Sequence, residues 1–306
     1  MKKKVVLIGG GHGLSNMVKG FKNENIDLTI VVSSSDDGGH TGEIRKEFQT
    51  VAVGDLRMVL NELIREDSSL KDIFDFRFNS LHGANKVSLG NLMITSLWMK
   101  YKDIDKVIRH FKEKEKFSAN VYLSSNNPIT LCAKCSDGEI IKQESIIGES
   151  NKIIESLYSE NEAFCNEEML AKIEEADIIV LGPGSLYTSV GAVICIDKIK
   201  KAINNSFASI VYVCNIMCQN GETLNYTVKD HEETLSRIMG RSIDRVIVNN
   251  GKVDKDVLDK YKKENSEVVV CDEIKDYYEF YDLVEIIDGR VMHNSDFTKK
   301  IILKQS

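Results

Sequence analysis

Short runs of apolar residues alternate with segments of helical period along most of the chain. An apolar run at residues 3–9 precedes a segment at 14–21 in which apolar side chains recur every three or four positions, and the same order returns at 27–34 and 43–48. Short, continuously apolar strands that lead into helices are typical of a parallel sheet buried on both faces. The pattern therefore predicts an α/β fold.

The middle of the chain breaks this alternation. Residues 120 to about 148 have the alternating pattern of antiparallel strands, with a hairpin turn at Asp137-Gly138. Elsewhere, helices are predicted within 55–64, 90–101, 191–203 and 231–239 and from about Val253, and strands within 176–185, 208–215, 243–250 and 266–272. Without repeats or linker-like stretches, we expect one domain spanning 1–306. Its doubly wound, mostly parallel sheet would carry a small antiparallel β-rich insertion at about 120–148.

Composition is that of a folded, soluble protein, with 42% hydrophobic residues and a formal charge of -7 from 40 basic and 47 acidic side chains. This balance gives no reason to expect general binding to nucleic acid or to an anionic membrane. No apolar run approaches the roughly 18 residues that span a bilayer, and the first three lysines are followed directly by a predicted strand. We therefore expect a cytoplasmic protein without a membrane span.

The first predicted strand ends in a glycine-rich turn, Gly9 to Gly13, in which His12 is the one residue other than glycine. Glycines at the start of a helix let backbone N–H groups approach a phosphate, because no Cβ stands in the way. The alternative is a tight turn without a ligand. Every frame of the dinucleotide fingerprint G-x-G-x-x-G fails here, and no P-loop is present. The pattern favours a phosphate contact and disfavours an ordinary NAD or P-loop site.

Acidic and basic side chains follow the next predicted strand. Asp36 and Asp37, followed by Gly38, could hold Mg²⁺ against a diphosphate or could be turn residues of an exposed loop. Asp55 is placed as a helix N-cap, and Arg57 would lie in the first turn, where a cation is unfavourable unless an anion is near. The segment is a candidate metal and phosphate site, in which Arg45 and Arg57 would neutralise the diphosphate.

A second glycine turn, "GPGS" at Gly182, Pro183, Gly184 and Ser185, ends a later predicted strand. Because ligands bind at the carboxyl ends of parallel strands, one ligand could lie between the two turns. The loop "NIMCQNGET" adds Asn215 and Gln219, uncharged groups suited to a base or sugar. The sequence contains no G-x-S-x-G nucleophile elbow, and this disfavours covalent hydrolase chemistry.

The ordered set of motifs resembles the YvcK family of bacterial gluconeogenesis factors, relatives of the CofD phospholactate transferases. The resemblance covers nearly the whole chain and rests on "GGGHGLS", "SDDGGHTGEIR", "GDLRMVL", "GNL", "NPIT", "SDGEIIKQESI", "LGPGSLYTS", "VYVCNIMCQNGETLNYTVKDH" and "IDRVIVN". It implies a Rossmann-like cytoplasmic protein that binds a nucleotide sugar such as UDP-N-acetylglucosamine, forms a homo-oligomer and is linked to gluconeogenic growth, cell shape and cell-wall precursor supply. Members look more like regulators than enzymes.

Departures from the family pattern fall within these motifs. Relatives usually have threonine where this chain has His12, histidine where it has Val87 and asparagine where it has Met58. They usually have threonine and proline where this chain has Cys218 and Asn220. Met292 stands where they usually have arginine. Methionine cannot replace the bidentate contact of an arginine. The resemblance thus supports the scaffold more strongly than the ligand.

We therefore expect a regulatory protein that binds a nucleotide sugar. It would require no cofactor, although Mg²⁺ could bind together with the ligand. The rivals are a CofD-like transferase with a metal on Asp36, Asp37 or Asp55, and a scaffold that acts through protein contacts alone. The candidate ligand-binding residues are Gly9, Gly10, Gly11, His12, Gly13, Leu14, Ser15, Asp36, Asp37, Gly38, Arg45, Asp55, Arg57, Asn91, Gly182, Pro183, Gly184, Ser185, Asn215 and Gln219.

Overall fold

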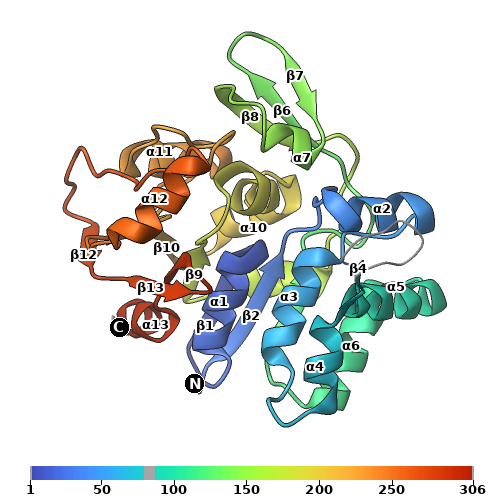
Figure 1. Cartoon of the computed structure of the whole chain (residues 1–306). Helices are drawn as coiled ribbons and strands as arrows, with labels where there is room; N and C mark the ends of the chain where they lie inside the picture. Colours follow the sequence, from blue (N-terminus) through green and yellow to red (C-terminus); the bar gives the residue numbers. More distant parts are fainter. Residues whose placement is uncertain (1, 79–86, 305–306) are drawn as a thin grey trace.

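The computed structural model describes residues 2–78 and 87–304. Its centre is a seven-stranded parallel sheet in the order β12-β11-β10-β9-β1-β2-β5 (Figure 1). These strands are β1 (Lys4–Gly9), β2 (Asp27–Val32), β5 (Asn120–Leu123), β9 (Ile178–Leu181), β10 (Ser209–Val213), β11 (Arg245–Asn249) and β12 (Tyr278–Tyr281). The predicted fold class is confirmed.

Helices cover both faces of this sheet. The helices in the described parts of the chain are α1 (Gly11–Phe21), α2 (Gly39–Phe48), α3 (Gly54–Leu63), α4 (Ser69–Asp75), α5 (Leu89–Tyr101), α6 (Ile104–Glu115), α7 (Glu144–Ile147), α8 (Glu167–Glu174), the π-helix η1 (Leu186–Gly191), α9 (Ala192–Ile194), α10 (Asp197–Asn205), α11 (Val228–Met239), α12 (Lys255–Lys263) and α13 (Ser295–Leu303).

Alternate residues of the central strands enter two separate cores. Val6 and Ile8 of β1 pack in the core that also holds side chains of α8, α10 and α11, whereas Val5 and Leu7 pack with α1, α3 and α6. Successive strand side chains point to opposite faces, so a strand buried on both faces reads as a continuous apolar run. This is the physical reason why the apolar runs predicted a parallel sheet.

The antiparallel insertion has other boundaries than those predicted. Residues 120–123 are β5, which pairs with β2 in parallel as an edge of the main sheet. The insertion is a separate three-stranded sheet of β7 (Ile140–Lys142), β6 (Leu131–Cys135) and β8 (Ile154–Ser159), which projects from the body of the molecule (Figure 1). The alternation of buried and exposed positions could not show which partner each strand would find.

The predicted strand at 266–272 was also wrong. This segment forms one isolated bridge, Met217 with Val268, and the parallel edge strand is β12 instead. The predicted helix at 191–203 is divided among η1, α9 and α10. The helical period breaks at Ile196, which has an extended backbone and is the N-cap of α10.

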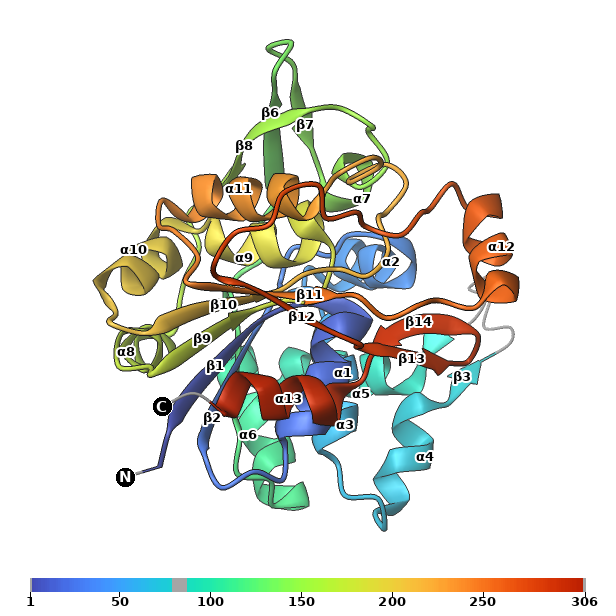
Figure 2. The same ribbon diagram turned by 90° about the vertical axis from the view of Figure 1, so that its left-hand side faces the viewer.

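Two further pairs of strands stand apart from the main sheet. They are β3 (Arg77–Phe78) with β4 (Val87–Ser88), and β13 (Val284–Ile287) with β14 (Arg290–His293). Figure 2 shows α13 beside α1, which brings β14 close to the start of α1. Within residues 2–78 and 87–304, no helix has the length and apolar character to cross a membrane.

Candidate functional site

Strands β1 and β9 are neighbours in the sheet, and the chain adds its later strands on opposite sides of this pair. From β1 the chain adds β2 and β5 on one side, and later β9 to β12 on the other. The loops that leave β1 and β9 therefore diverge and open a crevice at the strand ends, where α/β proteins bind ligands. A pocket of about 280 Å³ lies there. Its wall consists of Gly10, Gly11, His12, Gly13, Asn16, Pro183, Gly184, Ser185, Ser189, Asn215, Ile216, Met217, Gln219, Val291, Met292 and His293.

The N-terminus of α1 forms one side of the pocket. Gly10 is the N-cap, no side chain caps the helix, and Gly11 has a φ of 59°, which favours glycine. The Gly11 N–H donates to the carboxylate of Asp55. First-turn N–H groups lack partners inside a helix, so those of His12 and Gly13 are suited to bind an anion.

The "GPGS" turn forms the opposite side and lies against α1. A Cβ built on Gly13 would be 2.2 Å from the carbonyl oxygen of Pro183, so only glycine allows this approach. Gly182 has a φ of 72°, and Ser185 is the N-cap of η1. The two glycine turns thus meet across the crevice, as their positions at strand ends predict.

Asn215 holds this turn in place. Its side-chain oxygen accepts a hydrogen bond from the Gly184 N–H at 3.1 Å, and its Nδ2 donates to the Gly184 carbonyl at 2.9 Å. Both ends of the amide contact the turn, and the prediction that Asn215 also reads a base or sugar stays a prediction. The side chain positions the pocket wall.

The third side of the pocket is largely apolar and comes from Ile216, Met217, Val291 and Met292. His293 completes it. Desolvation lowers the pKa of the buried His293 ring to about 4, and its Nε2 lies 3.0 Å from the carbonyl oxygen of Cys214. A carbonyl only accepts, so the neutral ring carries its proton on Nε2.

Several lining residues were not among the sequence candidates: Asn16, Ser189, Ile216, Met217, Val291 and His293. Met292, placed by motif alone in an arginine position, does line the pocket. Asn16 donates to the His293 carbonyl at 2.6 Å and so joins α1 to β14. This contact spans most of the chain, and no local pattern signals it.

Other candidates lie off the pocket wall: Gly9, Leu14, Ser15, Asp36, Asp37, Gly38, Arg45, Asp55, Arg57, Asn91 and Gly182. Leu14 is in the core behind α1, Ser15 donates to the His12 carbonyl, and Asn91 is buried in α5. Of the sequence candidates, the structure gathers Gly10 to Gly13, Pro183 to Ser185, Asn215 and Gln219.

The two arginines predicted to neutralise phosphate have other partners. Arg57 donates to Asp75 at 2.6 Å with its side chain 7% exposed. Arg45 donates to the carbonyl oxygens of Ser35, Asp36 and Ile129. Each guanidinium thus holds separate elements together, and its contact with a phosphate stays a prediction. The pKa of His12 is lowered mainly by desolvation and further by the positive charges of Arg57 and Arg77. Arg57 therefore influences the pocket electrostatically.

The carboxylates of Asp36, Asp37 and Asp55 lie outside the pocket wall, and that of Asp55 is next to Gly10. Asp55 is the second residue of α3, whose N-cap is Val53, so the predicted N-cap role was wrong. Desolvation, with repulsion from Asp36, raises the pKa of Asp55 to about 7. Asp37 accepts from the Glu144 and Ser145 N–H groups at the start of α7. It therefore caps that short helix.

No group of three or more His, Cys, Asp or Glu side chains in the described parts of the chain is arranged to hold a metal ion. Asp36 and Asp55 interact electrostatically, and the Gly38 N–H donates to Asp36 at 3.0 Å. Mg²⁺ commonly binds through one or two carboxylates together with substrate phosphates. These two carboxylates are therefore compatible with an ion shared with a bound phosphate.

A doubly wound sheet with a donor-lined pocket at its switch point defines the class of Rossmann-like α/β proteins. Comparison with known families narrows this class. Residues 5–288 match the model of a family described as 2-phospho-L-lactate transferase CofD. The chain belongs to this CofD/YvcK family.

Relatives within the family are close over most of their length. The chain is 38% identical to a putative gluconeogenesis factor of Thermotoga maritima over 88% of this chain and 86% of the relative. It is 37% identical to a gluconeogenesis factor of Halalkalibacterium halodurans, over 90% of this chain and 86% of the relative. A crystal structure of a UPF0052 family member from Bacillus halodurans superposes with a TM-score of 0.94 at 34% identity, covering 99% of this chain and all of that one.

Proposed function

We propose that the pocket binds the diphosphate of a nucleotide sugar such as UDP-N-acetylglucosamine, and that binding serves regulation. The regulated processes would be gluconeogenic growth, cell shape and the supply of cell-wall precursors. The observation that carries the proposal is the close approach of the uncapped α1 N-terminus to the "GPGS" turn, at Gly13 and Pro183. The first-turn N–H groups of α1 and the hydroxyl groups of Ser185 and Ser189 can then contact one ligand.

The lining of the pocket supports this ligand class. Among the described lining residues none is acidic, so no carboxylate on the wall repels an anion. Ser185 and Ser189 add hydroxyl donors near the glycine turns, while Met217 and Met292 offer a polarizable apolar surface to a planar ring. Polar groups at one end and apolar groups at the other suit a phosphate joined to a nucleoside.

Titration calorimetry with UDP-N-acetylglucosamine tests the proposal. We expect saturable binding that N-acetylglucosamine alone does not reproduce, because the α1 N-terminus recognises the anionic group. Parallel titrations with and without Mg²⁺ show whether an ion shared with Asp36 and Asp55 contributes. Absence of binding at millimolar nucleotide sugar in both series would remove this ligand from the account.

A CofD-like transferase is the second candidate, favoured by the carboxylates next to the pocket. Asp55 contacts the Gly11 N–H, and Asp36 lies close enough to raise its pKa. A metal-dependent turnover of a nucleotide-diphosphate donor that is lost in Asp36→Asn would select the enzyme. Binding without turnover would select the regulator.

A further inference from the structure

The apolar wall of the pocket depends on a segment distant in sequence. Residues 266–271, which we call the brace segment, run antiparallel to residues 216–218, which we call the pocket loop. The Cys218 N–H donates to the Glu267 carbonyl at 2.8 Å, and the Val269 N–H donates to the Ile216 carbonyl at 2.9 Å. Ile216 and the neighbouring Met217 line the pocket, so the brace segment fixes the backbone of that wall.

Side-chain contacts strengthen this junction on the Cys218 side. The Ser266 hydroxyl donates to the Cys218 carbonyl, and the Glu267 N–H donates to the Cys218 thiol sulfur at 3.0 Å. Since Cys218 directly follows Met217, a shift of the brace segment would displace the pocket wall. The brace segment is also attached to α11 through its backbone, since the Val228 N–H at the start of that helix donates to the Val270 carbonyl at 3.0 Å.

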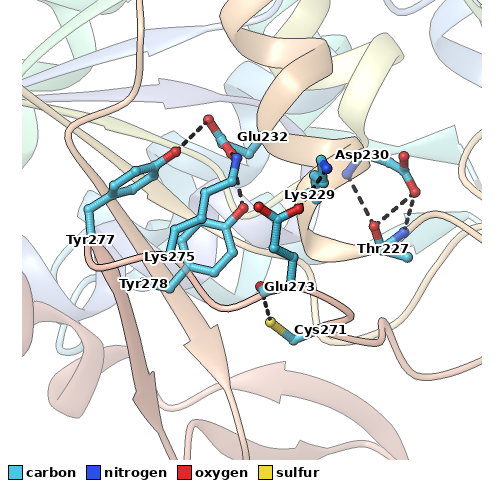
Figure 3. A network of polar contacts seen from close by, with 9 residues as sticks. All are labelled: Thr227, Lys229, Asp230, Glu232, Cys271, Glu273, Lys275, Tyr277 and Tyr278. Atoms are coloured by element: carbon cyan, nitrogen blue, oxygen red, sulfur yellow. Dashed lines mark hydrogen bonds and ion pairs between the residues drawn. The ribbon is translucent and has the colours of Figure 1, made fainter.

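A cluster of side chains around Glu232 of α11 adds to this attachment (Figure 3). Its carboxylate accepts from the Lys275 ammonium at 2.6 Å, from the Tyr278 hydroxyl at 2.9 Å and from the Tyr277 hydroxyl at 3.3 Å. The side chains of Glu232 and Lys275 are only 8% and 19% exposed. Lys275 lies four residues after the brace segment and joins its end to α11.

The ion pair in this cluster is held in a charged state. Desolvation is the strongest single influence and lowers the pKa of Lys275, but the hydrogen bonds and charges of Glu232 and Tyr277 together outweigh it and raise the pKa of the ammonium. Removing one member of a buried pair leaves the other charge without compensation. The segment after Cys271 would then lose its fixed place on α11.

We propose that Glu232 and Lys275 are positioning residues for the ligand pocket: their ion pair fixes the brace segment, which in turn holds the Ile216–Met217 wall. The inference rests on the proposed function for the identity of the ligand. It concerns the apolar end of the pocket, because the glycine turns are anchored separately by Asn215.

Lys275→Met tests the proposal, with Lys229→Met as the matched control. Lys229 also joins α11 to the same loop, through Glu273 at 2.6 Å, but this pair is 37% and 47% exposed (Figure 3). Exposed pairs contribute little. We expect roughly tenfold weaker binding of UDP-N-acetylglucosamine in Lys275→Met, an unchanged affinity for inorganic pyrophosphate, and wild-type values in the control.

A general loss of structure would weaken both ligands equally and would contradict a positioning role. Equal nucleotide-sugar affinity in Lys275→Met and wild type would also overturn it. Lys275→Arg retains the cation and should restore most of the affinity. If Lys275→Met does not fold, Tyr278→Phe removes one hydrogen bond to Glu232 and serves for the same comparison.

Hydrogen exchange separates this inference from the proposed function. If the wild-type protein binds no nucleotide sugar, the ligand assignment fails, but the brace can still be measured without ligand. We expect the Cys218 and Val269 amides to exchange roughly tenfold faster in Lys275→Met than in Lys229→Met. Unchanged exchange at both amides would overturn the inference whatever the protein binds.

Discussion

Gly13→Ala is expected to abolish ligand binding and to destabilise the protein by about 2 to 3 kcal/mol. The new Cβ would lie 2.2 Å from the Pro183 carbonyl oxygen and 2.7 Å from its carbon, both backbone atoms that a rotamer change cannot move. Helix α1 and the "GPGS" turn would have to separate. Alanine in a helix is otherwise favoured over glycine by about 1 kcal/mol, so a loss of stability identifies the clash.

Gly9→Ala is the matched control for this prediction. Its Cβ would meet Leu14 at 3.6 Å, an ordinary contact, and Gly9 does not line the pocket. Urea denaturation and calorimetry of both variants give the comparison. Binding by Gly13→Ala at wild-type affinity would show that the close approach of the two turns is not needed for the ligand.

Asp55→Asn is expected to stabilise the protein increasingly as pH rises from about 4 to 7. Folding raises the pKa of this carboxyl from 3.8 to about 7, mainly by desolvation. The folded state therefore retains a proton that the unfolded chain has lost, and the stability from Asp55 falls as pH increases through this window. The difference between variant and wild type should grow by about 1.4 kcal/mol per pH unit.

Denaturant titrations at intervals between pH 4 and 8 measure this difference. The asparagine retains an oxygen that can accept from the Gly11 N–H, so the helix start is kept while the charge is removed. Glu144→Gln should follow the same direction, since desolvation raises the pKa of Glu144 to about 8. If the difference in unfolding free energy between Asp55→Asn and wild type stays constant with pH, the raised pKa of Asp55 is contradicted.

The sequence predicted the parts of the site that follow from strand ends. Gly10 to Gly13 and Pro183 to Ser185 come directly after β1 and β9, and parallel strands place their carboxyl ends at one edge. Neighbouring strands in the sheet need not be neighbours in sequence, yet the edge is shared by all of them. Position at a strand end was therefore sufficient to bring the two turns together.

Side-chain partners could not be predicted in the same way. Arg57 looked like a phosphate contact because a cation in a first helical turn is unfavourable, and the structure supplies Asp75 as its partner. Asn215 was predicted as a ligand group, and the structure shows that it holds Gly184 in place. In both cases the decisive contact joins separate elements, which local spacing does not encode.

The strand at 266–272 failed for a related reason. Its valines have strand character, but the segment bonds to the loop at residues 216–218 and to the start of α11 and does not join the main sheet. Apolar pattern indicates burial and does not say against what. The insertion boundary at β5 has the same cause, since a strand at the edge of a parallel sheet and one in a hairpin share a similar pattern.

Backbone amide shifts during titration of ¹⁵N-labelled protein with UDP-N-acetylglucosamine test the central claim most directly. The claim is that one diphosphate lies between the start of α1 and the "GPGS" turn. The account predicts saturable shifts that are largest at His12, Gly13, Gly184 and Ser185. Saturable binding with its largest shifts away from both turns, or no shift at millimolar ligand, would contradict it.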